Sequence, residues 1–231
     1  MKIKQYIIFT VICLLFINIQ IAFAQKTNPI GSITQLFGDI ELTRNGKKKE
    51  AKENSQIYLG DRIDTDEDEF TKIVFNDGTS IEIASDTSLE VNEFVYNPGE
   101  RKSKFNILKG TIKSEISKIQ SPNSSVEFQT RNAVAGVKGT VLYINANDDF
   151  FGVRVGRIYV RGLHTGSKTV YVSGGYYTTV VNGVPIVPRI MTQAMLRQFD
   201  DIFDYRRYLP SEVNKVIRKT PFNLKKPKLF K

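Results

Sequence analysis

The feature that most constrains the fold is a short hydrophobic alternation on both sides of a turn sequence. Apolar and polar residues alternate over Thr71–Phe75 and again over Ser80–Ala84, which is the period of a half-buried strand. The intervening Asn76-Asp77-Gly78-Thr79 contains an Asp-Gly pair, and such a pair supplies the positive-φ positions that a tight hairpin turn requires. We therefore predict a β-hairpin over residues 71–84.

Similar segments along the chain extend this prediction to a whole domain. Short runs rich in β-branched and aromatic residues are separated by turn sequences such as Asn97-Pro98-Gly99. The further predicted strands are 88–94, 105–108, 111–116, 140–144, 151–155, 157–161, 169–172 and 176–181. Short strands at close spacing predict an all-β fold, a wound β-roll or solenoid-like sandwich, while the lack of a fixed repeat length argues against a regular β-helix.

After Pro188 the hydrophobic period changes to that of a helix. The apolar residues at this spacing are Met191, Met195, Leu196, Phe199, Ile202 and Phe203. Pro210-Ser211-Glu212 suggests a second helix start with Ser211 as its cap. We predict a small helical appendage over residues 189–214.

The N-terminal residues have the pattern of an export signal. Lys2 and Lys4 precede the apolar run 6–17, and Ala22-Phe23-Ala24 provides a small-x-small cleavage site. This predicts a secretory signal peptide over residues 1–24 and secretion across the inner membrane, to the periplasm or the outer surface.

An uncleaved N-terminal anchor is the alternative to this signal peptide. Asn18 and Gln20 interrupt the roughly 20 apolar residues that a membrane-spanning helix needs. Cys13 lies inside the segment, so cleavage after Ala24 would leave a chain with no cysteine. That chain could form neither disulfides nor thiolate metal sites.

The net charge of +9 is concentrated at the two ends of the chain. Of 33 basic residues, 2 lie in the predicted signal peptide and 7 in residues 215–231, which leaves 24 against 24 acidic residues between them. The basic tail contains Lys215, Arg218, Lys219, Lys225, Lys226, Lys228 and Lys231. A neutral central region argues against nucleic acid as a partner. The tail could contact anionic lipid, lipopolysaccharide or a cell-wall polymer, or it could be a solvated end.

Glycine- and aspartate-containing blocks follow one another in order along the predicted strands. They are Gly60-Asp61-Arg62-Ile63-Asp64-Thr65, Phe75-Asn76-Asp77-Gly78-Thr79, Leu108-Lys109-Gly110 and Thr130-Arg131-Asn132-Ala133-Val134-Ala135-Gly136-Val137-Lys138-Gly139-Thr140. This ordered set resembles the FecR domain over about residues 30–185, and we predict a FecR-like β domain over 30–188.

The residues of these blocks are predicted to be structural. Glycines allow backbone angles or close approaches that a side chain forbids, and short carboxylates accept backbone N–H bonds in turns. The predicted structural set is Gly60, Asp61, Thr65, Asp77, Gly78, Gly110, Ala135, Gly136, Gly139 and Thr140.

The resemblance implies an extracytoplasmic sensing or interaction module. Founding members of the family relay a signal from an outer-membrane transporter to a cytoplasmic sigma factor. This sequence places no domain before its apolar segment that could hold a sigma factor, and the 43 residues after Pro188 are short and basic. We therefore expect the domain to serve another interaction here.

Residues with catalytic or metal-binding chemistry are few. His164 is the single histidine and belongs to no nucleophile motif, so we interpret it as a loop residue. The acidic run Asp64–Glu69 begins like a calcium loop, but Glu69 and Phe75 replace the glycine and the glutamate that an EF-hand requires. We predict no enzyme, no metal and no cofactor.

Three tyrosines near a Gly-Gly pair offer a second interpretation. Tyr171, Tyr176 and Tyr177 could stack on a sugar ring, although tyrosine on a strand is ordinarily a packing residue. The leading hypothesis is a non-catalytic module that binds envelope proteins in a signalling or assembly complex. A carbohydrate- or peptidoglycan-binding protein is the alternative, and an envelope hydrolase would require a carboxylate cleft that the sequence does not indicate.

Overall fold

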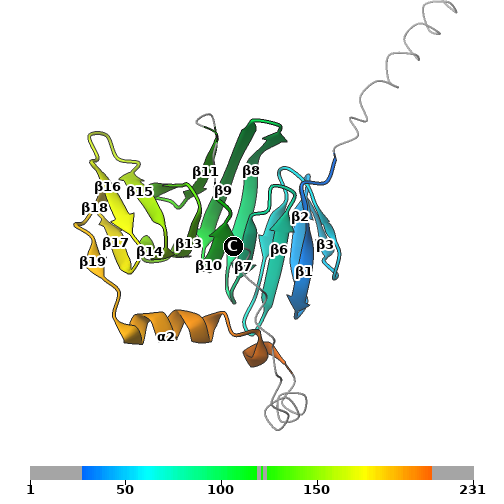
Figure 1. Cartoon of the computed structure of the whole chain (residues 1–231). Coiled ribbons are helices and arrows are strands. Elements are labelled where there is room, and N and C mark those ends of the chain that lie inside the picture. Colours follow the sequence, from blue (N-terminus) through cyan, green and yellow to red (C-terminus); the bar gives the residue numbers. More distant parts are fainter. Residues whose placement is uncertain (1–27, 119–120, 122–123, 210–231) are drawn as a thin grey trace, which may run out of the picture.

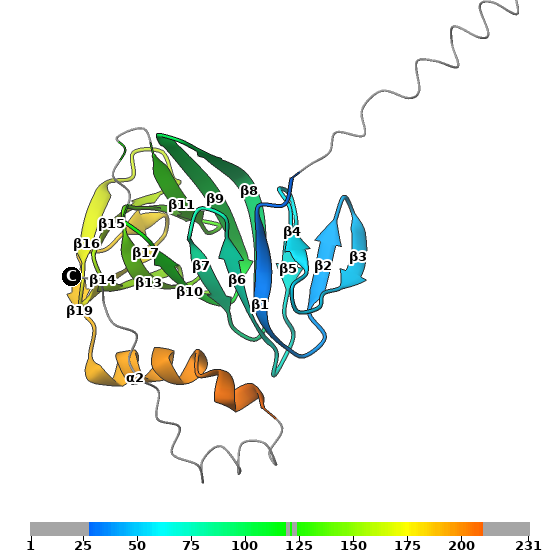
Figure 2. The same cartoon turned by 45° about the vertical axis from the view of Figure 1, so that its right-hand side comes forward.

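The computed structural model describes residues 28–118, 121 and 124–209. They form two β-sheets stacked as a sandwich, with α2 (Gln193–Ile202) running beneath them in Figures 1 and 2. The predicted all-β class with a C-terminal helix is thus confirmed. Within the described residues, no helix combines the length and the apolar character needed to cross a membrane.

Three sequence-based predictions fall on residues that lie outside this description. They concern the signal peptide over 1–24, the helix start at Ser211 and the basic tail over 215–231. The signal peptide, the second helix and the tail contacts remain predictions.

The first sheet, sheet A, has ten strands in the order β18-β17-β14-β13-β10-β7-β6-β1-β4, with β19 also paired to β17. Its strands are β1 (Gly31–Phe37), β4 (Gln56–Ile57), β6 (Phe70–Phe75), β7 (Ser80–Ile83), β10 (Thr111–Ile116), β13 (Thr140–Asn145), β14 (Phe150–Val155), β17 (Tyr176–Val181), β18 (Val184–Pro185) and β19 (Arg189–Ile190).

The second sheet, sheet B, has nine strands in the order β16-β15-β12-β11-β9-β8-β5-β2-β3. They are β2 (Glu41–Arg44), β3 (Lys47–Glu50), β5 (Arg62–Asp64), β8 (Ser88–Asn97), β9 (Glu100–Lys109), β11 (Ser125–Gln129), β12 (Ala133–Val137), β15 (Arg157–Gly162) and β16 (Thr169–Ser173). Edge strand β3 is fully exposed and carries three lysines, a composition that disfavours pairing with another sheet edge.

The predicted hairpin over 71–84 is present as β6 and β7, but its turn differs from the prediction in one respect. Gly78 has a φ of +80°, whereas Asp77 is not among the positive-φ residues. The Phe75 N–H donates to the Thr79 carbonyl, which makes a three-residue loop. A loop of this length needs one left-handed residue rather than two, so Asp77 keeps ordinary angles and contributes its carboxylate instead.

The core lies between the two sheets and is filled by the inward-facing side chains of both. Phe75 of sheet A meets Phe105 of β9 at a ring-centroid distance of 5.0 Å, and Phe105 meets Phe128 of β11 at 5.2 Å. Strands β9 and β11 run parallel, with Phe105 opposite Phe128. In the sequence, β10 of sheet A lies between these two strands. Their parallel pairing therefore requires the chain to cross to the other sheet and return.

The C-terminal helix begins after Met191, where the helical spacing of apolar residues starts, and it lies on the outer side of sheet A. Thr192 caps α2 by accepting the Met195 N–H, so Met191 precedes the helix rather than beginning it. Residues 189–190 are the strand β19, because the Met191 N–H donates to the Gly175 carbonyl and keeps this segment extended.

The apolar residues of α2 belong to a second core, separate from the one between the sheets. Phe199 stacks on Tyr143 and Phe150 at centroid distances of 4.6 and 5.2 Å. Asp200 forms an ion pair with Arg154, and the phenol of Tyr143 bonds to both. The helix is therefore an integral layer over sheet A.

Candidate functional site

Asp77, a residue of the Asn-Asp-Gly-Thr block, joins the two sheets through hydrogen bonds. Its carboxylate accepts the Thr79 N–H at 2.9 Å and the Nε–H of Arg101, on β9 of sheet B, at 2.8 Å. Arg101 also donates to Thr79 Oγ1 at 2.7 Å and to Ser117 Oγ at 3.0 Å. The side chains of Asp77 and Arg101 are 0% and 9% exposed, so the pair is a buried clamp.

Asp61 forms a comparable clamp near the other end of the sandwich. Its carboxylate accepts two bonds from Arg44, both at 2.7 Å, and the Tyr58 N–H at 2.9 Å. Arg44 lies on β2 of sheet B and also donates to the Gln56 carbonyl on β4 of sheet A. The hydrogen bonding of the Arg44 guanidinium to the Asp61 carboxylate, which accepts, is the main cause that raises the pKa of Arg44.

Asp149 makes a third clamp, in the turn between β13 and β14. Its carboxylate accepts the Thr130 hydroxyl at 2.5 Å and the Asn132 amide at 2.6 Å. These bonds tie the turn between β13 and β14 of sheet A to the turn between β11 and β12 of sheet B. The Thr-Arg-Asn part of the FecR-like block is therefore structural.

The other block residues also lie in scaffold positions. Gly60, Gly78, Gly110 and Gly139 have positive φ, and Ala135 lies in the core. Thr65 donates to the Ala84 carbonyl at 2.6 Å, and Thr140 donates to the Arg157 carbonyl at 3.1 Å.

Neither the acidic run nor the histidine forms a reactive centre with its neighbours. Asp64 pairs with Arg62, and Glu69 accepts the backbone N–H groups of Asp39 and Asp66. His164 is exposed, with Nδ1 facing the Thr165 carbonyl. Among the described residues, no group of three or more His, Cys, Asp or Glu is arranged to hold a metal ion.

The three tyrosines proposed as a stacking surface do not form one surface. Tyr177 is on β17 of sheet A and stacks on Phe150 at a ring-centroid distance of 5.0 Å, in the second core between sheet A and α2. Tyr176 alternates with it and points to the other side of the same strand. Tyr171 is on β16 of sheet B and is 68% exposed. The tyrosine directly opposite Tyr171 in the strand register is Tyr159 of β15.

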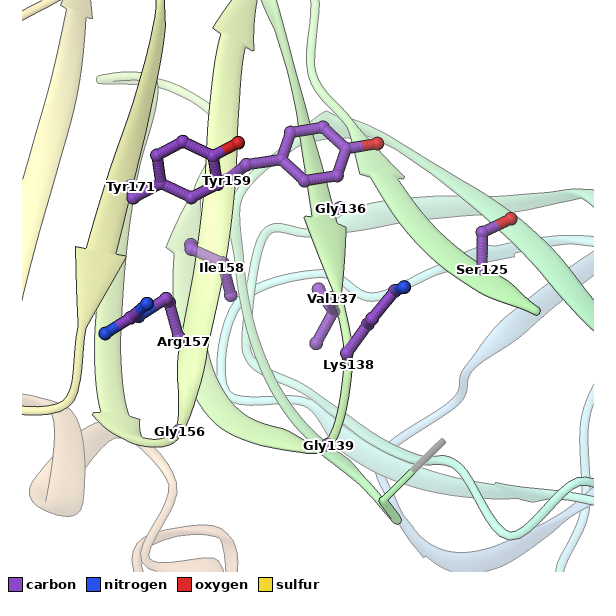
Figure 3. A pocket seen from close by; sticks show the side chains of 10 residues that line it. All are labelled: Ser125, Gly136, Val137, Lys138, Gly139, Gly156, Arg157, Ile158, Tyr159 and Tyr171. Carbon is purple, nitrogen blue, oxygen red and sulfur yellow. The ribbon is translucent and has the colours of Figure 1, made fainter. Parts of the chain in front are cut away.

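A hollow of about 660 Å³ lies on the outer face of sheet B beside these two rings. Figure 3 shows Tyr159 and Tyr171 side by side, with the side chains of Lys138 and Arg157 on opposite sides of the view; all four residues line the hollow. The floor includes Gly136, which is opposite Tyr159 in the register. A Cβ at Gly136 would lie 2.0 Å from the Tyr159 ring. The ring can therefore lie over residue 136 only because this residue is a glycine.

Tyr159 is held in place by a hydrogen bond outside the hollow. Its hydroxyl donates to Glu127 at 3.1 Å. Burial of the ring, and next the negative charge of Glu127, raise the pKa of this phenol. The ring is therefore a fixed neutral surface at physiological pH.

The residue that sequence reasoning missed here is Tyr159. The signal was available, because 157–161 and 169–172 were predicted as consecutive strands. Pairing them as an antiparallel hairpin places Tyr159 opposite Tyr171. Arg157 is two residues before Tyr159 on the same predicted strand, so the alternation places it on the same face. Lys138 follows β12 and could not be found in this way.

Two comparisons with known proteins bear on the chain. The family model described as FecR protein matches residues 61–160. Two crystal structures of "a putative anti-sigma factor from Parabacteroides distasonis ATCC 8503", at 1.65 and 2.50 Å resolution, are 15% and 16% identical, with a TM-score of 0.47 each. Each alignment covers 60% of this chain and 63% of the other, so the chain spans less than two thirds of the structures that it matches.

A search of curated proteins finds no match. The matched segment contains all three clamping aspartates, Asp61, Asp77 and Asp149, and Asp61 is its first residue. It also includes the glycine blocks from Gly78 to Gly139. Residues 61–160 of the chain therefore match the FecR protein family model.

Proposed function

We propose that the protein is a non-catalytic interaction and sensing module of FecR type, which acts in the cell envelope by binding other proteins in a signalling or assembly complex. The FecR domain supports a regulatory role. The observation that carries protein binding is an open, apolar edge of sheet A, which we call the edge segment (residues 181–190).

The edge segment exposes four large aliphatic side chains. Val187 and Ile190 are 80% and 68% exposed, and Val181 and Val184 are about half exposed. Within the described residues, β18 and β19 pair only with β17. Both strands are two residues long, and Pro185 of β18 has no N–H, so the segment presents side chains rather than a strand for pairing. Exposed apolar side chains gathered on one segment are typical of surfaces that receive a partner protein.

The buried carboxylates support the non-catalytic part of the proposal. Asp61, Asp77 and Asp149 are each within hydrogen-bond distance of at least two donors. A general acid or base has to reach a substrate, whereas these groups face the interior. The envelope location rests on the predicted signal peptide over 1–24 and the lack of cysteine after it.

Crosslinking and mass spectrometry in native envelopes test this function. We expect the wild-type chain to crosslink to a small set of envelope proteins through the edge segment. The double variant Val187→Ser/Ile190→Ser should lose these crosslinks without unfolding, because both side chains are exposed. Leu59→Ser is the matched control, since Leu59 is 53% exposed at a distant loop and should leave the crosslinks unchanged. Crosslinks that persist in the double variant would contradict the proposal.

The basic tail is proposed as a second, weaker contact with anionic lipid, lipopolysaccharide or a cell-wall polymer. Its seven cations would act through screened attraction, which falls as salt rises. Deleting residues 215–231 should release the protein from envelopes at low salt and have little effect at high salt. Unchanged retention at both salt levels would refute this contact.

A further inference from the structure

We propose that the hollow on the outer face of sheet B binds an acidic saccharide, a sugar ring that carries a carboxylate or a phosphate. This site goes beyond the proposed protein binding, which is assigned to the edge segment of the other sheet. The argument rests on the two tyrosine rings, the glycine floor, the adjacent cations and the pairing of the surrounding strands.

The aromatic part of the hollow presents rings that a sugar could stack on. Tyr159 lies over Gly136, and Tyr171 lies beside it on the next strand. Because the Tyr159 hydroxyl is bonded to Glu127, little rotamer freedom is lost when a ligand settles on this ring. The apolar C–H face of a pyranose matches the face of a tyrosine ring, while the sugar hydroxyls remain free to meet water and polar groups.

The charged part of the hollow predicts an anionic substituent. Lys138 and Arg157 line the hollow, and no Asp or Glu is among its lining residues. Within the part of the chain that the structure describes, neither cation takes part in an ion pair. Arg157 offers a planar fork that suits carboxylate or phosphate, and Lys138 offers a point charge.

The strand pairing favours a saccharide over an acidic peptide. Extended peptides gain much of their affinity by adding a strand to an open sheet edge. Strands β11, β12 and β15, which supply most of the hollow, are each paired on both sides. Over these three strands a peptide would therefore contact only side chains, whereas β16, which carries Tyr171, is the edge strand of sheet B. The volume of about 660 Å³ is within the usual range for small-ligand sites.

Calorimetric titration of the purified full chain tests the site. The probes are trigalacturonic acid for the carboxylate, glucose 6-phosphate for the phosphate, neutral maltotriose, and a hexaglutamate peptide. We expect one acidic saccharide to bind at least about tenfold more tightly than maltotriose and hexaglutamate, with affinity falling as salt rises. Which of the two acidic probes binds identifies the anionic group.

Single variants connect the binding to the hollow. Tyr171→Ala and Arg157→Gln should each weaken the acidic saccharide roughly three- to tenfold, and Arg157→Gln should also flatten the salt dependence. The controls are Tyr96→Ala, which removes a 56% exposed tyrosine of β8, and Arg197→Gln on the exposed side of α2.

Three results would overturn the proposal: no acidic saccharide binds, maltotriose or hexaglutamate binds equally well, or Tyr171→Ala leaves the affinity unchanged. None of these depends on the edge segment. Failure of the saccharide site and failure of protein binding are therefore distinguishable, because Val187→Ser/Ile190→Ser should bind the saccharide normally.

Discussion

Replacing Asp77 by alanine should remove the best-defined link between the two sheets. The variant leaves the Arg101 guanidinium, whose side chain is 9% exposed, without its carboxylate. It also leaves the Thr79 N–H and the Thr79 hydroxyl without the oxygens that they now bond. Together with the Ser103 hydroxyl, which also donates to Asp77, four polar groups thus lose this carboxylate.

The expected loss follows from this burial. Removing one partner of a buried ion pair costs about 3–5 kcal/mol, because the other charge remains buried and uncompensated. We expect Asp77→Ala to lower the free energy of unfolding by about that amount. With a urea m-value of about 2 kcal/mol per molar, the midpoint should fall by roughly 2 M. Urea titration followed by tyrosine fluorescence and circular dichroism measures the shift.

The control is a surface pair on the same strand as Arg101. Lys102 and Glu100 lie 2.6 Å apart with about 40% of each side chain exposed, so Glu100→Ala should cost less than about 1 kcal/mol. Replacing both clamp residues, as Asp77→Leu/Arg101→Met, should recover part of the loss because no charge is left buried. A cost for Asp77→Ala no larger than that of Glu100→Ala would refute the clamp as a source of stability.

Three further predictions concern the second core and the hollow. Burial raises the pKa of Tyr143 and of Tyr159, so their contribution to stability is fully present below the unfolded value of about 10. It is lost as pH rises through the raised values, and tyrosinate absorbance should show a late component that Tyr143→Phe and Tyr159→Phe remove. Phe199→Ala should free α2 from sheet A at a cost of about 3 kcal/mol, seen as roughly hundredfold faster hydrogen exchange of its amides. Gly136→Val should displace the Tyr159 ring and abolish saccharide binding, while thermal unfolding reports a cost of about 1–3 kcal/mol.

Local patterns predicted the elements well, because the alternation of apolar residues is a local property of a strand. The hairpin over 71–84 and the helix around Phe199 both follow from spacing alone. Where a helix or strand boundary differs from the prediction, a tertiary contact overrides the local spacing. Met191 has the right spacing for the helix but stays extended through its bond to Gly175.

The assignment of strands to sheets could not be read from the sequence in the same way. The parallel pairing of β9 with β11 brings Phe105 beside Phe128, although strand β10 of sheet A lies between them in the sequence. No local pattern indicates that these two strands pair. The clamps have the same origin. The sequence predicted that Asp77 accepts backbone N–H bonds within its own turn. Its bond to Arg101, 24 residues away in the sequence, forms only when the two sheets are stacked.

The glycine at position 136 connects the scaffold with the proposed site. Glycine inside a strand costs about 0.5–1 kcal/mol relative to alanine, and the core does not require it, since Gly136 alternates with the inward-facing Ala135 and Val137. The missing side chain instead lets the Tyr159 ring lie over the strand. An aromatic ring packed over a strand glycine recovers part of the free energy that the glycine costs. Stability is therefore a sufficient reason for the Gly136–Tyr159 contact. It does not account for the exposed Tyr171 beside it, or for Lys138 and Arg157 without acidic partners. That combination is best explained by a ligand that is both ring-shaped and negatively charged.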